Sequence, residues 1–456
     1  MRKWNEAIDL VRKTVHGRRC RSFSKAVFYL SLFVALSCVL FASTDNAFAG
    51  DTKLGRFATD QHNVHGDLSV SNSITASKIN KVIIVDGDTY PQTSAGINAA
   101  ISALGSAGGE VFLPEGTYAI SDALSVSSYT TIRGAGASTI LSLATGANTY
   151  VIGDADPAST ERNITIRDLK IEGNDAGNTG ADCYGVYLRD VTESAVINVW
   201  VDDTEDNGIQ ASNCNSSVIE RCSVNNATYG ILVYYSNGTR VVNSTARNNE
   251  AAGIGVHSSS NCIVAGNVAA TNATHGIYVS ATSQFAYSNI ISANIAEYNT
   301  EDGINVYRRS YYTQVISNQV RYNQNGIHIE GGGTSYAVRR SLVSNNYCLQ
   351  NAQNGIRAVE SDYASILGNK LTDNGDSGNY SSIYVGSDSN ETLISGNAIQ
   401  DSAGTGYAIH IDGTTCDNTT LTNNIFSGTG ASSIQNSGTL TRFTQPEHIT
   451  VGDPTN

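Results

Sequence analysis

A short pattern recurs about every 22 to 29 residues between Cys183 and Phe426. It consists of a glycine, then Ile or Val, a free position and another apolar residue. A fixed period of this size indicates a stack of structural repeats rather than a conventional globular core. The glycines of the pattern are Gly185, Gly208, Gly230, Gly253, Gly276, Gly303, Gly326 and Gly355, and the pattern loosens at Ser382-Ile383 and Ala408-Ile409.

The other half of the repeat contains an aliphatic residue, two free positions, Asn, a free position and an apolar residue. Asparagine tolerates the left-handed backbone of a tight turn, and stacked amides hydrogen-bond to one another. We interpret this column as a structural ladder rather than a ligand groove, because Val199, Cys222 and Ser244 take its place in earlier repeats. The column contains Asn267, Asn294, Asn318, Asn346, Asn369, Asn397 and Asn424.

Apolar and polar residues alternate within each repeat, which predicts short β-strands joined by polar turns. No segment between them is apolar enough for a crossover helix. These features predict an all-β, single-chain parallel β-helix of roughly 11–13 coils, with equivalent strands about 4.8 Å apart. The handedness of parallel connections favours a right-handed coil.

A helix is predicted after Thr93, because Ile97, Ala100, Ile101 and Leu104 would share one face. Such a helix would cover the open end of the first coil. The β-helix is expected over residues 82–426, and residues 427–456 are expected to form a cap or tail.

Residues 1–49 have the features of a signal peptide. Basic residues that include Arg18 and Arg19 precede the apolar run 26–42, and Ala47 and Ala49 supply small residues before Gly50. We therefore predict a secreted or cell-surface protein with no membrane span after cleavage, and the alternative is an uncleaved anchor. Residues 50–81 would form an N-terminal arm, and in one alternative this arm joins the subunits of a homotrimer.

The mature chain would be strongly acidic. Without residues 1–49, 20 Lys and Arg and 38 Asp and Glu remain, which gives a net charge of −18. This charge argues against nucleic acid and anionic membranes as partners. The six cysteines after the leader show no metal-site spacing, so most are expected to be small buried residues, with one disulfide open among Cys183, Cys214 and Cys222.

The N-terminal part contains motifs that mark a known superfamily. Gly108-Gly109, the segment 112–118 (FLPEGTY) and Arg133-Gly134-Ala135-Gly136 resemble the start of pectate-lyase-like right-handed β-helix proteins, and the resemblance covers residues 82–175. It implies a relation to polysaccharide lyases, glycoside hydrolases, alginate C5-epimerases or phage tailspikes. Their activity motifs do not carry over: Asp156-Pro157 is followed by Ala158 instead of His, and Gly-His-Gly is absent.

The outward face of the central coils has an unusual composition. Outward residues form rows along a β-helix. Here the rows gather His, Arg and Tyr, and the turn that follows the strand adds Arg308, Arg309 and Tyr312. Tyrosine rings stack on sugars, and guanidinium groups pair with carboxylates. We predict a catalytic set of His328, Tyr307, Arg357 and Glu330, and a substrate-binding set of Tyr278, Asn305, Arg308, Arg309, Tyr312, His257 and Asp302.

This set fits proton abstraction from a uronate sugar. His328 or Tyr307 would remove the proton, Arg357 would hold the carboxylate, and Glu330 would orient the base or return a proton. The leading hypothesis is therefore a lyase or epimerase on an acidic polysaccharide. Strand spacing would place Asp302 and Glu330 about 14 Å apart, which is too far for the two carboxyl groups of a glycosidase. Glu330 and Glu360 would be closer, so this pair is kept as an alternative glycosidase pair.

Two other functions stay open: a non-catalytic adhesive β-helix that binds glycans, and a trimeric tailspike-like glycosidase. We predict no cofactor and no metal in the catalytic site. A calcium site is considered only at an acidic cluster, for which a solvated loop is the alternative. The cluster comprises Asp175, Asp182, Asp202, Asp203, Glu205 and Asp206.

Overall fold

The computed structural model describes residues 81–155, 160–180, 182–375, 380–402, 406–428, 433–444 and 448–449. The predicted leader, the arm apart from Lys81, and residues 450–456 lie outside this part of the chain. Export and trimer formation therefore stay predictions. No helix within the described ranges is long and apolar enough to cross a membrane.

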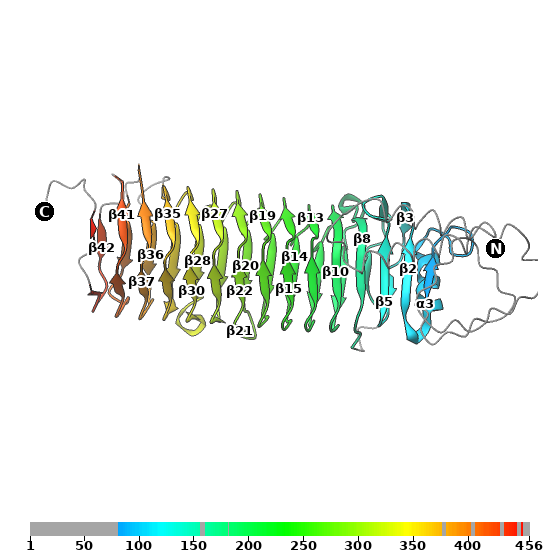
Figure 1. Cartoon of the computed structure of the whole chain (residues 1–456), viewed down its shortest axis with the longest axis horizontal. Coiled ribbons are helices and arrows are strands. Elements are labelled where there is room, and N and C mark those ends of the chain that lie inside the picture. Colours follow the sequence, from blue (N-terminus) through cyan, green and yellow to red (C-terminus); the bar gives the residue numbers. More distant parts are fainter. Residues whose placement is uncertain are drawn as a thin grey trace, which may run out of the picture. The chain divides into compact units, whose positions relative to one another are not determined.

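The described chain forms a stack of β-coils in which every strand pair is parallel (Figure 1). Three sheets run along the stack, and we number them 1 to 3. Sheet 2 has 13 strands. These are β4 (Leu124–Val126), β7 (Ile152–Asp154), β9 (Val186–Arg189), β11 (Ile209–Ser212), β14 (Ile231–Tyr234), β17 (Ile254–His257), β20 (Ile277–Ser280), β24 (Ile304–Tyr307), β28 (Ile327–Glu330), β32 (Ile356–Val359), β36 (Ile383–Gly386), β39 (Ile409–Asp412) and β42 (Ile434–Asn436).

Sheet 1 has 27 strands and supplies most of each coil. They are β1 (Val82–Ile84), β2 (Gly109–Leu113), β3 (Gly116–Ile120), β5 (Thr130–Gly134), β6 (Thr139–Leu143), β8 (Thr165–Glu172), β10 (Ala195–Asp202), β12 (Val218–Glu220), β13 (Ser223–Asn225), β15 (Arg240–Val242), β16 (Thr245–Arg247), β18 (Ile263–Ala265), β19 (Val268–Ala270), β22 (Ile290–Ser292), β23 (Ile295–Glu297), β26 (Gln314–Ile316), β27 (Gln319–Arg321), β30 (Leu342–Ser344), β31 (Tyr347–Leu349), β34 (Ser365–Leu367), β35 (Lys370–Thr372), β37 (Leu393–Ser395), β38 (Ala398–Gln400), β40 (Thr420–Thr422), β41 (Ile425–Ser427), β43 (Arg442–Phe443) and β44 (His448–Ile449).

Sheet 3 is short and covers four consecutive coils. It contains β21 (Ala286–Tyr287), β25 (Ser310–Tyr311), β29 (Val338–Arg339) and β33 (Ser361–Asp362). In each of these coils it follows directly after the strand of sheet 2. The all-β coil predicted from the repeat is thus confirmed.

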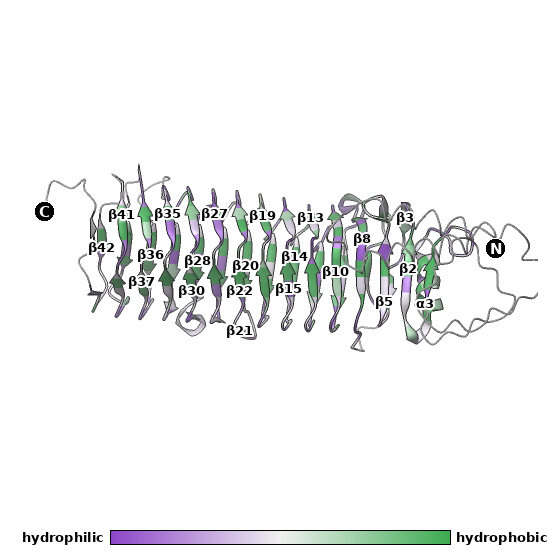
Figure 2. Ribbon diagram, in the orientation of Figure 1, coloured by the Kyte–Doolittle hydropathy of each residue, from purple (hydrophilic) through white to green (hydrophobic). Residues whose placement is uncertain are grey.

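The strands of sheet 2 stack in exact repeat register, so equivalent residues form rows. Ile304 pairs with Ile327 and Ile327 with Ile356, and all three side chains are fully buried. Apolar residues recur on successive coils along the whole stack (Figure 2). Burying one such side chain stabilises the fold by about 1.5–3 kcal/mol, so each coil depends on contacts with the coils on either side.

The predicted asparagine ladder is present. Each amide Nδ2 donates to the Oδ1 of the next ladder residue, at 2.9–3.0 Å from Asn267 to Asn424. The left-handed backbone, however, belongs to the preceding residue, such as Ser317 (φ 57°) or Asn345 (φ 55°). The prediction that the ladder asparagine itself takes this conformation was wrong.

A second ladder was not predicted. Asn249, Asn272, Asn299, Asn323, Asn351 and Asn374 repeat the same amide contacts at 2.8–3.1 Å. Its sequence signal is an asparagine five residues after a member of the first ladder, as at Asn318 and Asn323. Two amide rows therefore run through the coils beside the apolar core.

The two ends of the described stack differ. Helix α3 (Ser94–Leu104) begins after Thr93, whose Oγ1 accepts from the Gly96 N–H at 3.3 Å, and it buries Ile97 and Leu104 as predicted. At the other end, pairing continues beyond Phe426, since β42, β43 and β44 add to sheets 2 and 1. Short 3-10 segments occupy Gly105–Ala107, Asp175–Gly177 and Thr334–Tyr336.

The six described cysteines are buried and unpaired. The disulfide left open by the sequence is therefore not formed between Cys183, Cys214 and Cys222. Burial raises the pKa of the Cys214 and Cys222 thiols to about 12, which makes them unreactive. These residues act as small core side chains.

Candidate active site

A groove of about 750 Å³ lies on the outer face of sheet 2, from β20 to β39. Seven residues that the sequence singled out line it: Tyr278, Asp302, Asn305, Tyr307, His328, Glu330 and Arg357. Ten further lining residues were not in the predicted set: His275, Glu301, Gln324, Asn325, Gln353, Asn354, Tyr380, Ser381, Tyr384 and His410. The strand rows thus predicted the middle of the groove but not its walls.

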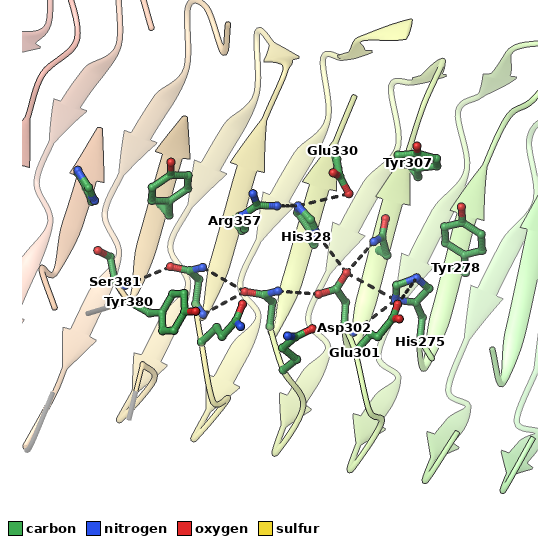
Figure 3. A pocket seen from close by; sticks show the side chains of 17 residues that line it. His275, Tyr278, Glu301, Asp302, Tyr307, His328, Glu330, Arg357, Tyr380 and Ser381 are labelled. Carbon is green, nitrogen blue, oxygen red and sulfur yellow. Dashed lines mark hydrogen bonds and ion pairs between the residues drawn. The ribbon is translucent and has the colours of Figure 1, made fainter. Parts of the chain in front are cut away.

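Asp302 and His328 form a buried pair at the floor of the groove (Figure 3). Nδ1 of His328 lies 3.0 Å from Oδ2 of Asp302, and the two residues are 5% and 4% exposed. The strand register explains the contact, because Asp302 precedes β24 while His328 stands on the next coil in β28.

Arg357 decides which nitrogen of His328 carries the proton. It stands beside His328 in the row of sheet 2, and its guanidinium hydrogen-bonds Nε2. A guanidinium can only donate, so Nε2 is the acceptor and the ring proton sits on Nδ1, facing Asp302. His328 is therefore neutral, with its basic lone pair directed toward Arg357 and the groove.

Glu330 completes this cluster from the same strand as His328. Its Oε2 lies 3.7 Å from Nε2 of His328, and its side chain is 35% exposed. A carboxylate at this distance would stabilise a positive imidazolium once Nε2 gains a proton.

Asp302 is held as a carboxylate by several donors. Asn305 Nδ2 donates to its Oδ2 at 2.6 Å, and Asn325 Nδ2 donates to its Oδ1 at 2.8 Å. Burial alone would raise the pKa of Asp302, but the hydrogen bonds that it accepts from His328 and Asn325 bring the pKa below its ordinary value. Both oxygens of Asp302 are thus engaged, and its contact with Nδ1 holds the imidazole of His328 in place.

His275 occupies the neighbouring coil with the opposite tautomer. Its Nδ1 accepts from the backbone N–H of Asp302 at 3.3 Å, so its proton is on Nε2, which faces Glu301 Oε2 at 3.3 Å. Burial lowers the pKa of His275. A neutral ring is thereby fixed against Asp302 at one end of the groove.

Tyrosines border the two ends of the groove. Tyr278 and Tyr307 stack with ring centroids 6.2 Å apart, and burial raises the pKa of Tyr278 to about 12. At the other end Tyr384 donates to Asp412 at 2.8 Å, and burial together with this contact raises its pKa to about 12. Both phenols therefore stay protonated and offer flat rings with a polar edge.

Four residues of the predicted substrate-binding set do not line the groove. His257 is enclosed edge-on between Tyr229 and Tyr278, at centroid distances of 5.2 Å. Arg308 and Arg309 lie on the turn between β24 and β25, and Tyr312 follows β25. All three have a left-handed backbone, which redirects the chain away from the groove.

Comparison with known proteins identifies the fold. A family model described as "Right handed beta helix region" matches residues 128–269 and 184–343. The chain folds as a right-handed parallel β-helix. A search of curated protein sequences gave no match.

Three solved structures resemble this β-helix. The Azotobacter vinelandii mannuronan C-5 epimerase AlgE6 A-module is 18% identical with a TM-score of 0.57, covering 78% of this chain and 96% of that one. The Streptococcus pneumoniae surface protein and adhesin PfbA is 14% identical with a TM-score of 0.54, covering 79% and 100%. Bacteriophage CBA120 tailspike protein 3 is 12% identical with a TM-score of 0.61, covering 96% and 72%. At these identities the likeness concerns the fold alone.

The β-helix places the carboxylates differently from the strand-spacing estimate. Asp302 and Glu330 face the two nitrogens of one imidazole, so the estimate that kept them about 14 Å apart was wrong. They still do not form a glycosidase pair, because Asp302 is buried and its oxygens are occupied. Glu360 is also engaged, since it accepts from the backbone N–H of Gly333.

No metal site is assembled in the described part of the β-helix. None of its residues form a group of three or more His, Cys, Asp or Glu side chains suited to a metal ion. The acidic residues considered for calcium, among them Asp202 and Asp203, do not form such a group. Asp202 instead accepts from Asn225 Nδ2 at 2.9 Å.

Proposed function

We propose that the groove removes the C5 proton of a uronic acid residue in an acidic polysaccharide. The observation that carries the proposal is the chain of contacts from Asp302 through His328 to Arg357, which leaves a basic nitrogen beside a guanidinium. A guanidinium binds a carboxylate through two hydrogen bonds. Proton abstraction next to a carboxylate needs this combination of base and cation.

Substrate binding would itself activate the base. The uronate carboxylate would take over the guanidinium of Arg357 and thereby free the lone pair on Nε2 of His328. The C5–H bond then breaks, its proton moves to Nε2, and its electron pair spreads into the carboxylate held by Arg357. Asp302 and Glu330 stabilise the imidazolium that forms.

Two outcomes can follow from the same intermediate. If the C4–O4 bond breaks, a C4–C5 double bond forms, the departing O4 takes a proton, and the reaction is that of a lyase. If C5 receives a proton on the opposite face, the reaction is that of an epimerase. Tyr307, part-exposed and in register with Glu330, is our proposed proton donor for either outcome.

The proposal includes export, because acidic polysaccharides occur outside the cell and residues 1–49 have the features of a signal peptide. A non-catalytic, glycan-binding β-helix is the second candidate. An observation outside the groove favours this candidate: Arg340 stacks on the exposed Tyr312, a combination suited to binding an acidic glycan.

Activity of groove variants tests the proposal. On polymannuronate, polyguluronate and polygalacturonate, His328→Gln should lower kcat by about 10²–10⁴-fold, because the base is lost. Arg357→Lys should raise KM and lower kcat, because a lysine cannot pair with both carboxylate oxygens. Absorbance at 235 nm detects elimination, and NMR detects epimers; Arg247→Gln, an exposed change on β16, is the control.

Full activity of His328→Gln, alongside an active wild type and control, would refute His328 as the base. Binding of the three polyuronates without any chemistry would favour the glycan-binding candidate instead.

A further inference from the structure

A second surface lies on the turns that follow sheet 2, outside the groove. We define the arginine–tyrosine face as Phe285, Arg309, Tyr312, Tyr336, Arg340 and Tyr363, carried by sheet 3 and its flanking turns. Phe285, Tyr312 and Tyr363 are 42–44% exposed. Sheet 3 spans four coils, with β21 at the lower edge of the stack in Figure 1.

The backbone shows that large side chains here replace small ones. Each coil has a left-handed residue two positions before the next strand of sheet 1. In four earlier coils this residue is Ser216, Gly238, Asn261 and Ser288, with φ of 53–68°. In the next three coils it is Tyr312, Arg340 and Tyr363, with φ of 56–57°. Small residues and asparagine fit this conformation better than bulky ones. Glu193 and Glu391 stand at the same position before β10 and β37, so the turn accepts larger residues, but it does not require Tyr or Arg.

The arginines are stacked on rings rather than neutralised. The Arg340 guanidinium carbon lies 5.6 Å from the Tyr312 centroid and 5.3 Å from that of Tyr363. Arg309 lies 4.4 Å from the Tyr336 centroid and 5.7 Å from that of Phe285. Within the described residues, Arg339 on β29 pairs with Asp362 at 3.2 Å, whereas Arg309 and Arg340 make no ion pair.

Stacking leaves the edges of these guanidinium groups available. Arg340 donates to Tyr312 Oη at 2.6 Å, and Arg309 donates to the Thr282 carbonyl at 3.3 Å, while Nε of Arg309 is buried without a partner. Positive charge is thus concentrated on a strongly acidic chain. A guanidinium binds a carboxylate or sulfate through planar pairs of hydrogen bonds, and sugar rings can stack on the exposed aromatic rings.

We propose that the arginine–tyrosine face is a second, non-catalytic binding site for an anionic polysaccharide. The bound chain would run along the stack, with acidic groups on Arg309 and Arg340 and sugar rings on Tyr312 and Tyr363. The site does not depend on chemistry in the groove. Carboxylated and sulfated glycans share the required charge, and the test separates them.

The experiment measures binding in a His328→Gln background, which removes the proposed base. The probes are polygalacturonate, dextran sulfate and uncharged dextran, and calorimetry measures their affinity. Adding Arg309→Gln and Arg340→Gln should weaken binding of an anionic probe at least tenfold, because two charge-assisted contacts are lost. Arg247→Gln removes one positive charge at an exposed position of β16 and should leave affinity within twofold.

Tyr312→Asn with Tyr363→Asn tests the rings without risking the fold, since Asn261 occupies the equivalent left-handed position. This pair should also weaken anionic probes several-fold. Stronger binding of polygalacturonate would identify a carboxylated glycan, and stronger binding of dextran sulfate a sulfated one. The proposal is overturned if neither anionic probe binds, if dextran binds equally well, or if both double variants keep the parental affinity.

The outcome of this binding test is separate from the outcome of the activity test of the groove. Loss of binding on the face would leave C5 chemistry intact on short oligosaccharides, whereas an inactive groove would leave the calorimetry unchanged.

Discussion

At the residue scale, the floor of the groove belongs to a row of polar residues that hydrogen-bond from coil to coil. The residues before the repeat glycines are His275, Asp302, Asn325 and Asn354 along successive coils, and Asn354 Nδ2 donates to Asn325 Oδ1 at 3.1 Å as in a ladder. Asp302 continues that chain by accepting from Asn325. Asp302 in turn accepts the Nδ1 proton of His328, so scaffold and site share one hydrogen-bonded row.

His257 predicts a pH dependence of stability. Burial lowers its pKa from 6.5 to about 4. Between these values the unfolded chain binds a proton that the folded ring rejects, so stability is full above about pH 6.5 and falls as the pH drops toward 4. His257→Phe keeps the ring between Tyr229 and Tyr278 and removes this proton.

The wild type should therefore lose about 2 kcal/mol more than His257→Phe between pH 7 and pH 4.5. Urea unfolding at the two pH values measures the difference. An equal loss for both proteins would show that His257 is protonated or exposed in the folded state.

At the element scale, the turns between strands depend on the amide rows. Asn318 donates to Ile291 O at 2.9 Å and to Asn346 Oδ1 at 3.0 Å, and it accepts from both nitrogens of Asn294. A buried group left unsatisfied costs about 1–3 kcal/mol. Each ladder residue thus ties three coils together.

Asn318→Ala should lower the free energy of unfolding by about 3 kcal/mol, because several buried partners lose a hydrogen bond at once. Ser317→Ala, at the exposed neighbouring position, should change it by less than about 0.5 kcal/mol. Denaturant unfolding of the two variants provides the comparison. Similar values for both would mean that the ladder does not stabilise the turns.

The sequence predicted much of each element but little of how the turns direct side chains. The glycine-Ile period was enough to place Ile304, Ile327 and Ile356 in the core and His328 beside Arg357, since both follow from strand alternation. It placed Arg309 and Tyr312 on the following turn but could not show that they lie outside the groove, because left-handed turn residues are set by the local backbone and carry no period. Contacts across coils, such as that of Asp302 with His328, depend on residues outside the strand, where alternation ends.

At the scale of the whole β-helix, a repetitive core supports two different outer surfaces. The groove on sheet 2 combines the buried His328 with Arg357, and the arginine–tyrosine face on the adjoining turns combines stacked arginines with exposed rings. Both occupy overlapping central coils. This arrangement would let one anionic chain be held at the face while another segment reacts in the groove.

The central claim is that the groove breaks the C5–H bond of a uronate. The most direct measurement follows the H5 signal of polyuronates by proton NMR in D₂O, because elimination removes H5 and epimerisation replaces it with deuterium. The wild type should lose the H5 signal of at least one substrate, and His328→Gln should keep it. Persistent H5 in the presence of the wild type, or new reducing ends formed while H5 is retained, would contradict the account.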